Sequence, residues 1–207
     1  VSTLAGSGSI GSTNATGTSA KFYYPIGVAN VGNYLYVTDR HNHKIRKIVK
    51  STGVVTNFAG SGSAGSTNAT GTSAKFYYPW DITNDGKNLY VGDGHNHRIR
   101  KIVIATGVVT TFAGSSSGFA DGIGTSAKFN YPYGVGSDAN NVYVADYYNH
   151  RIRKIPISGK ETADVAMHNL DDDTDLTVSV ASTDTGEATV SPATLTFTEN
   201  NWNSAKT

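Results

Sequence analysis

A repeat of 54 residues constrains this chain more than any other feature of its sequence. The segment SGSIGSTNATGTSAKFYYP at 7–25 returns at 61–79 with a single difference, Ala64 in place of Ile10. VSTLAGSGS at position 1 returns as VTNFAGSGS at 55 and VTTFAGSSS at 109, and LYVTDRHNHKIRKI at 35–48 returns at 89–102 and, one residue early, at 142–155. A period of this size indicates stacked supersecondary units.

Within each unit the apolar residues alternate with period two and are rich in β-branched and aromatic types, which predicts strands. The first strand of the unit is expected at Ile26–Asn30, Trp80–Thr83 and Tyr133–Gly136, and the second at Tyr34–Thr38, Leu89–Gly92 and Val142–Ala145. The third strand is expected at Lys44–Val49, Arg98–Val103 and Arg151–Ile155, and the fourth at Val54–Ala59 and Val108–Ala113. Short strands joined by tight turns are typical of β-propeller blades. We therefore predict an all-β fold with three four-stranded blades.

The run NLYVGDGHNHRIRKI … GVVTTFAGS … GTSAKFNYP resembles the bacterial NHL-repeat propellers. The Asn-His-Arg-Ile-Arg-Lys run that marks this family matches Asn96–Lys101 and Asn149–Lys154, and it matches Asn42–Lys47 with Lys44 in place of the first Arg. The resemblance covers residues 1–156 and implies a propeller domain over 1–158. Such propellers usually have more blades than the three units present.

The repeat stops after Pro156, and the remainder has a different pattern. LTVSVASTDTGEATVSPATLTFTENNWNSAKT resembles the opening part of β-sandwich modules found on bacterial surface proteins. It predicts a second domain, 159–207, with strands at Leu176–Ala181 and Leu195–Thr198. The alternating carboxylates Asp171, Asp173 and Asp175 are weak candidates for a Ca²⁺ site, and a solvated acidic linker is the favoured interpretation.

Composition bears on the class of function. The formal net charge is +1 over 207 residues, which gives no reason to expect nucleic acid as a partner, and no apolar run is long enough to insert into a membrane. No Ser-His-Asp arrangement, recognisable carboxylate pair or phosphate loop occurs, so we predict no enzyme, no catalytic residue and no cofactor apart from the possible Ca²⁺. Some NHL-like propellers are metal-assisted lyases or hydrolases, and that remains the least favoured alternative.

The abundance of Gly, Ser, Thr and Asn suits an extracellular or cell-surface β-protein. The chain opens without Met and without a signal-peptide pattern, so we expect a mature product or a fragment. The triplets at Asn14–Thr16 and Asn68–Thr70 fit the acceptor pattern for N-glycosylation, which makes Asn14 and Asn68 candidate sites in such a protein.

Propeller topology predicts that the loop before each first strand shares a face with the turn between the second and third strands. The candidate binding residues on that face are His41, His43, His95, His97, His150, Tyr24, Tyr78 and Tyr131. The histidines could bind a metal, although turn hydrogen bonds are the favoured role. The tyrosines could stack on sugars, although packing between blades is favoured. For Lys44, Arg46, Lys47 and their copies, ion pairs with carboxylates such as Asp39 are favoured over nucleic-acid binding.

The two ends of the propeller region match. The opening residues repeat the sequence of a fourth strand, whereas the third unit has no such strand after Pro156, which cannot donate to a ladder. The expected assembly strand consists of Val1, Ser2, Thr3, Leu4 and Ala5, paired with Arg151, Ile152, Arg153, Lys154 and Ile155. Because three blades are too few to fill a circle, we predict that this pairing joins separate copies.

Two functions follow from these observations. The first is a non-enzymatic extracellular structural protein that assembles with itself into a filament, tube or ring by strand exchange. The alternative is a binding module of a large surface adhesin that recognises a glycan or a protein through the loop face.

Overall fold

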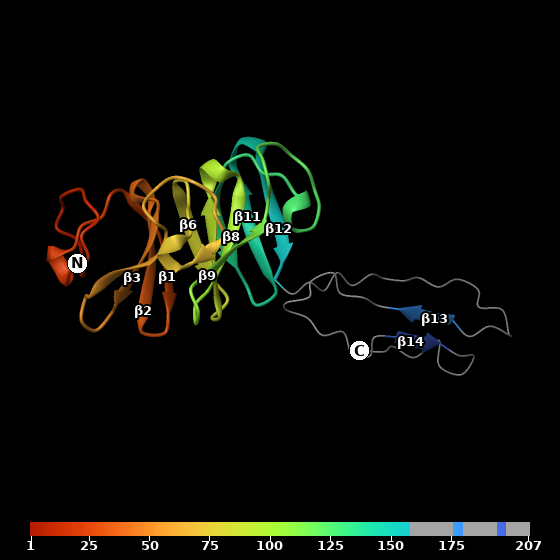
Figure 1. Cartoon of the computed structure of the whole chain (residues 1–207), viewed down its shortest axis with the longest axis horizontal. Helices are drawn as coiled ribbons and strands as arrows, with labels where there is room; N and C mark the ends of the chain where they lie inside the picture. Colours follow the sequence, from red (N-terminus) through yellow and green to blue (C-terminus); the bar gives the residue numbers. More distant parts are fainter. Residues whose placement is uncertain (158–175, 180–193, 198–207) are drawn as a thin grey trace. The chain divides into compact units, whose positions relative to one another are not determined.

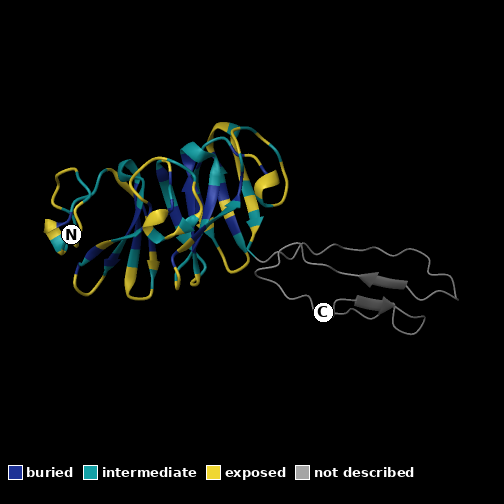
Figure 2. Ribbon diagram, in the orientation of Figure 1, coloured by how far each residue is buried: buried dark blue, intermediate teal, exposed yellow. Residues whose placement is uncertain are grey.

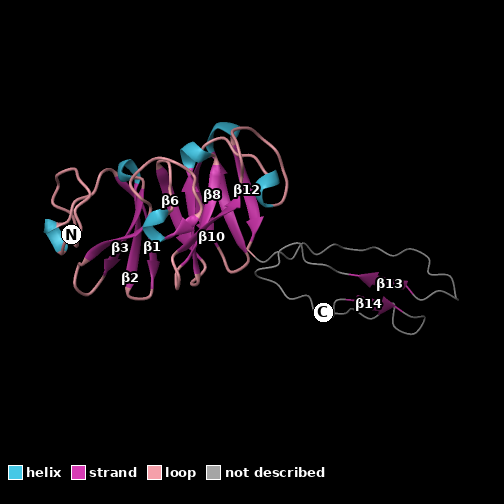
Figure 3. Cartoon of the chain, viewed as in Figure 1, coloured by secondary structure: helices cyan, strands magenta, loops and turns pink. Residues whose placement is uncertain are grey.

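The computed structural model describes residues 1–157, Leu176–Ser179 and Thr194–Phe197. The chain divides into two units, Val1–Ser158 and Gly159–Thr207. The described residues form β-strands joined by loops, and their helices are single 3₁₀ turns of three residues (Figure 3). No helix in this described part has the length and the apolar character that a membrane span requires.

The first unit consists of three antiparallel sheets, or blades, that lie side by side in chain order (Figure 1). Blade 1 contains β1 (Pro25–Val31), β2 (Tyr34–Asp39), β3 (Lys44–Val49) and β4 (Val55–Ala59). Blade 2 contains β6 (Pro79–Asn84), β7 (Asn88–Asp93), β8 (Arg98–Val103) and β9 (Val108–Ala113), with β5 (Ala69–Thr70) beside β9. Blade 3 contains β10 (Pro132–Ser137), β11 (Asn141–Asp146) and β12 (Arg151–Pro156).

The all-β fold and the order of strands agree with the sequence prediction, but the blades do not all have four strands. Blade 2 gains a fifth strand because its preceding loop runs back along the outer edge, where Ala69 pairs with Val109. Blade 1 has the beginning of the same arrangement, since Thr16 forms a bridge with Val54. The repeated loop therefore covers an outer edge that would otherwise expose unpaired backbone groups.

Blade 3 has three strands, and among residues 1–157 nothing pairs with the outer edge of β12. The residues of the expected assembly strand, Val1–Ala5, form no strand within the single chain. The pairing of that segment between copies stays a prediction.

The hydrophobic core lies between the blades, where the buried strands concentrate (Figure 2). Each blade has an entry face, which meets the preceding blade, and an exit face, which meets the following one. Between blades 1 and 2 the exit face supplies Ala29, Tyr36, Ile45 and Ala59, and the entry face supplies Ala74, Phe76, Ile82, Leu89, Val91, Ile102 and Val109. The equivalent residues of blades 2 and 3 form the second core.

In the second unit, β13 (Leu176–Ser179) pairs antiparallel with β14 (Thr194–Phe197), so that Leu176 lies opposite Phe197. Both strands fall within or overlap the expected ranges. The weak Ca²⁺ candidates Asp171, Asp173 and Asp175 lie outside the described residues.

Candidate functional site

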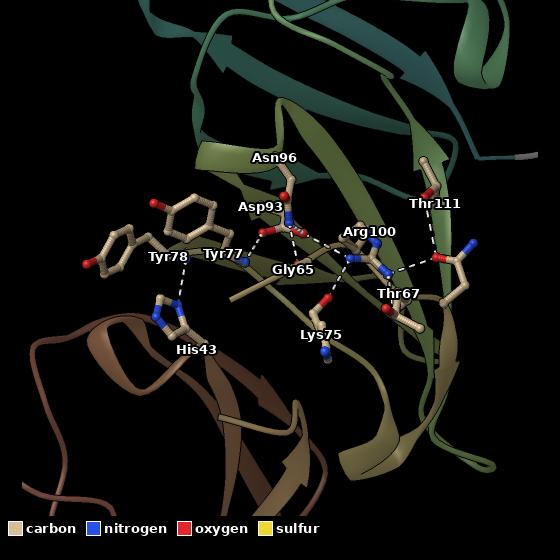
Figure 4. Close-up of polar contacts among 11 residues, drawn as sticks. His43, Gly65, Thr67, Lys75, Tyr77, Tyr78, Asp93, Asn96, Arg100 and Thr111 are labelled. Atoms are coloured by element: carbon tan, nitrogen blue, oxygen red, sulfur yellow. Dashed lines mark hydrogen bonds and ion pairs between the residues drawn. The ribbon is translucent and has the colours of Figure 1, made fainter. Parts of the chain in front are cut away.

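An ion pair links the second and third strands of each blade, near the turn that joins them. In blade 2, Asp93 is the last residue of β7, and Arg100 lies on β8 opposite Val91. The Arg100 Nη1 atom is 2.9 Å from Asp93 Oδ2, and both side chains are fully buried. Asp93 also accepts hydrogen bonds from the Tyr77 N–H at 2.8 Å and from Asn96 Nδ2 at 2.8 Å (Figure 4).

The guanidinium of Arg100 also holds the loop that precedes its own blade. Nη1 donates to the Lys75 carbonyl at 2.9 Å, and Nη2 donates to the Thr67 carbonyl at 3.1 Å and to Asn68 Oδ1 at 2.8 Å (Figure 4). Asn96 adds a hydrogen bond to the Gly65 carbonyl at 2.7 Å. Burial raises the pKa of Asp93 and lowers the pKa of Arg100, so each charge depends on its partner and on this network.

The other two blades repeat the same network. The equivalent residues are Asp39, Asn42 and Arg46 in blade 1 and Asp146, Asn149 and Arg153 in blade 3. The expected pairing of the basic strands with carboxylates is confirmed for Arg46, Arg100 and Arg153. Lys44 instead donates to Ser12 Oγ at 2.8 Å, and the Nζ atom of Lys47 lies 3.7 Å from the ring centroid of Tyr34. Arg46 and Arg100 are inaccessible to solvent, which removes them from any nucleic-acid surface.

The asparagines of the two glycosylation triplets take part in this network. Asn14 Oδ1 accepts from Arg46 at 2.7 Å, as Asn68 does from Arg100, and in blade 3 Asp121 supplies the oxygen to Arg153 at 2.7 Å. All three loops therefore place a side-chain oxygen, from Asn14, Asn68 or Asp121, against the arginine of their blade. Asn14 and Asn68 are exposed, and their glycosylation stays a prediction.

The histidine turns join neighbouring blades. His43 adopts a left-handed backbone with φ of 54°, and its Nδ1 atom accepts the N–H of Tyr78 in blade 2 at 3.1 Å (Figure 4). His97 accepts the N–H of Tyr131 in blade 3 at 3.2 Å in the same way. These histidines have a structural role, as predicted, but their side-chain bonds run to the next blade and not within the turn. His150 has the same backbone conformation at the exit side of blade 3.

Aromatic rings form a continuous tyrosine–histidine row across the three blades. His41 lies between Tyr24 and Tyr78, with ring centroids at 4.7 and 4.9 Å. His95 lies between Tyr78 and Tyr131 at 4.8 and 5.0 Å. Tyr148, which stands where the other repeats have His41 and His95, continues the row at 5.2 Å. The structure thus brings most of the candidate binding residues together.

The chemistry of this row is aromatic, with the cation Arg40 beside it at 2.8 Å from His41 Nε2. Burial is the main cause that lowers the pKa of His41, His43, His95 and His97, which favours the uncharged form of these rings. In the part of the chain that the structure describes, no three His, Asp or Glu side chains gather in a way that could hold a metal ion. Ring faces suit stacking against an apolar or sugar surface.

Sequence reasoning missed the contacts of Arg40. Its guanidinium lies 4.2 Å from the ring centroid of Trp80 and 5.0 Å from that of Tyr78, both in the next blade. Trp80 in turn stacks on Tyr133 of blade 3 at 3.9 Å. The sequence contains little indication of these contacts, because the repeats differ at this position. The second repeat has Gly94 and the third has Tyr147 where the first has Arg40.

Comparison with known proteins agrees with this architecture. The model of the NHL repeat matches residues 76–102 and 129–155. NHL repeat-containing protein 2 of Gallus gallus is 31% identical over 179 residues, which cover 73% of this chain and 25% of that protein. The Homo sapiens protein of the same name is 34% identical over 105 residues, covering 48% and 14% respectively. The chain therefore spans about a quarter or less of these relatives.

Two solved structures from Bacteroides are similar. An auxiliary nutrient binding protein from Bacteroides ovatus has 27% identity and a TM-score of 0.53, covering 60% of this chain and 35% of its own. A protein of the same description from Bacteroides thetaiotaomicron has 27% identity and a TM-score of 0.53, covering 59% and 34%. The NHL model matches two of the repeats, and the first blade has the same sequence pattern and the same buried network. This chain is therefore an NHL-repeat protein built from β-propeller blades.

Proposed function

We propose that this protein is a non-enzymatic, extracellular structural protein whose three-blade array joins to further copies of itself. The support comes from the two outer faces of the array. Each of them exposes apolar positions that the two internal interfaces bury, although Ala20, Val37, Ile48 and Val55 of blade 1 are buried within the single chain.

On the entry face of blade 1, Val28 is 58% exposed, whereas its equivalents Ile82 and Val135 are 4% and 9% exposed against a preceding blade. On the exit face of blade 3, Ile152 is 77% exposed, whereas Ile45 and Ile99 are fully buried. Apolar groups of this size favour burial by roughly 1.5–3 kcal/mol each. The two outer faces are therefore complementary in position and in chemistry.

The strand edges support the same proposal. Phe58 of β4 packs on Tyr36 with ring centroids at 4.8 Å, and Phe112 of β9 packs on Tyr90 at 4.9 Å. The equivalent positions at the ends of the array are Leu4 and Tyr143, and both are exposed. Docking Val1–Ala5 on the β12 edge of another copy brings these two side chains together.

Deleting Val1–Ala5 tests the proposal. Sedimentation velocity should show that the intact chain is larger than one copy and that the deletion variant is a single copy with an unchanged β-sheet circular dichroism spectrum. Ile10→Asp is the matched control, because Ile10 is an exposed apolar residue of the same segment outside the proposed strand. Normal assembly of the deletion variant would show that the strand is not the connection.

A second candidate function is binding of a glycan through the tyrosine–histidine row, as part of a surface adhesin. Its support is the exposure of Tyr24 and Tyr148 at the two ends of the row and the similarity to Bacteroides proteins described as nutrient binding.

Retention on insoluble polysaccharides tests this glycan-binding function. Tyr24→Ala with Tyr148→Ala should abolish retention, and Tyr34→Ala, which removes an exposed ring from outside the row, should leave it intact. Failure of the unmodified chain to be retained counts against this function.

A further inference from the structure

We infer that the tyrosine–histidine row binds an acidic glycan, a polysaccharide that contains uronic acids, and that Arg40 binds the carboxylate of the sugar. This inference rests on the second candidate function, binding of a glycan, and adds the chemical class of the ligand. It does not depend on self-assembly.

Arg40 is a cation without a carboxylate partner, unlike the arginines of the three buried networks, each of which pairs with an aspartate. Among the described residues, its guanidinium has one hydrogen-bond partner, His41 Nε2, at 2.8 Å from Nη1. The preceding residue, Asp39, is bound by Arg46. Arg40 is half-buried, so its charge is partly withdrawn from water without a neighbouring anion to compensate it. A bound anion would supply that compensation.

The rings beside Arg40 hold its guanidinium but do not use its hydrogen-bonding capacity. Its Cζ atom lies 4.2 Å from the ring centroid of Trp80 and 5.0 Å from that of Tyr78. Such contacts stabilise the charge, yet a guanidinium also has five N–H donors that require oxygen acceptors. A carboxylate matches these donors with two parallel hydrogen bonds. The ligand group that fits Arg40 is therefore a carboxylate.

The same rings provide a surface for the sugar. Trp80 stacks on Tyr133 with ring centroids at 3.9 Å, and Tyr78 contacts His95 at 4.8 Å. Burial is the largest cause, and the charge of Arg40 the second, that lowers the pKa of His95, which favours its uncharged ring. An aromatic surface with a fixed cation beside it suits a chain of sugars that carry carboxylates.

The repeats differ at this place, although the loops before blades 1 and 2 are nearly identical. Arg40 corresponds to Gly94 in the second repeat and to Tyr147 in the third. A Cβ atom at Gly94 would lie 2.7 Å from Trp80 Cδ1 and 3.0 Å from Tyr133 Cε1, so the glycine leaves room for the stacked pair. The three repeats thus contribute different side chains to one asymmetric site, which is what recognition of a particular ligand requires.

Native affinity electrophoresis of the full chain tests the class of ligand. The probes are two acidic polymers, alginate and polygalacturonate, and the methyl ester of polygalacturonate as the uncharged counterpart. Both acidic polymers should retard the unmodified chain, and the ester should retard it much less.

Variants at Arg40 test the site. Arg40→Gly introduces the residue of the second repeat and should lower the affinity for the acidic polymers by about tenfold to a hundredfold, as loss of hydrogen bonds to a charged group does. Arg40→Gln removes the charge from a side chain of similar reach and should give a comparable loss. Lys50→Ile is the matched control, because it also removes one exposed positive charge and introduces the residue of the second repeat, Ile104. Its affinity should be unchanged, and circular dichroism should show that all three variants are folded.

The other outcomes separate the ligand class from the glycan-binding function. Equal retardation by the ester and by the acidic polymers, or retention on neutral polysaccharides without retardation by either acidic polymer, would overturn the acidic class and retain glycan binding. Retardation that both Arg40 variants leave unchanged would overturn the site at Arg40. Failure of every polysaccharide to bind the unmodified chain would overturn the inference together with the function on which it rests.

Discussion

The buried ion pairs hold the loops that precede the three blades in a common conformation. Arg100 makes its hydrogen bonds to two backbone carbonyls and one side-chain oxygen of its loop, and Asp93 accepts from the backbone at Tyr77. A loop whose conformation did not bring these acceptors to the guanidinium would leave a buried charge without partners, at a cost of several kcal/mol. Conformation, rather than display of an epitope, accounts for the constraint on the loop.

Replacing a central carboxylate should destabilise the protein far more than replacing the exposed one. Asp93→Ala leaves Arg100 as an uncompensated buried charge and should lower the free energy of unfolding by about 3–5 kcal/mol. Asp121→Ala also removes a carboxylate from a blade arginine, but Asp121 is 83% exposed and the loss should be much smaller. Urea denaturation followed by Trp80 fluorescence measures both. Equal losses would contradict a network that depends on burial.

At the scale of the elements, the 3₁₀ turns after β2 and β7 connect adjacent blades through a histidine at the end of each turn. The Nδ1 atom of that histidine accepts a backbone hydrogen bond from the next blade. The Nδ1 atom of His43 or His97 can accept a hydrogen bond only while it carries no proton. The surroundings lower the pKa of both residues, mainly through burial. The neutral form is thus favoured in the folded protein.

Acid should therefore weaken the protein before its carboxylates titrate. Because the folded pKa of these histidines lies below 6.5, the unfolded chain takes up protons first. Their contribution to stability is present above pH 6.5 and is lost as the pH falls through the folded pKa values. Denaturation midpoints should decline between about pH 7 and about pH 5. His43→Asn with His97→Asn keeps an acceptor that tolerates the left-handed backbone, and this variant should show a smaller decline. An equal decline would assign the effect to other groups.

The strands and the faces of the blades could be predicted from the sequence, since alternation of apolar residues reports directly on burial in a sheet. The structural role of the histidines was predicted, but their hydrogen-bond partners were not. Tyr78 and Tyr131 donate through their backbone N–H groups, which every residue except proline has, so the residue type does not reveal them. The fifth strand β5 was missed for a similar reason: Ala69 and Thr70 pair through backbone atoms in a segment whose composition is that of a loop.

For the whole molecule, the property that decides self-association is the difference in exposure between the outer and the internal faces. Ile152 is exposed on an outer face, whereas Ile99 is buried at the equivalent position of an internal face. Ile152→Glu should abolish self-association and leave the fold intact, because Ile152 is exposed within a single chain. Ile99→Glu places the same charge at the equivalent buried position and should unfold the array. Size-exclusion chromatography and circular dichroism together measure these results. Unchanged association of Ile152→Glu would exclude the exit face of blade 3 as the contact.

The attachment of each arginine to the loop before its own blade has a consequence for the gene. A segment from Gly6 to Ala59, or from Gly60 to Ala113, encodes a blade together with the acceptors that bind the two Nη atoms of its arginine. Duplication of such a segment adds a blade together with its arginine network, and deletion removes both. The near identity of 7–25 and 61–79 is what a recent duplication would leave. Lineages that carry this gene should therefore differ in length by whole multiples of the repeat.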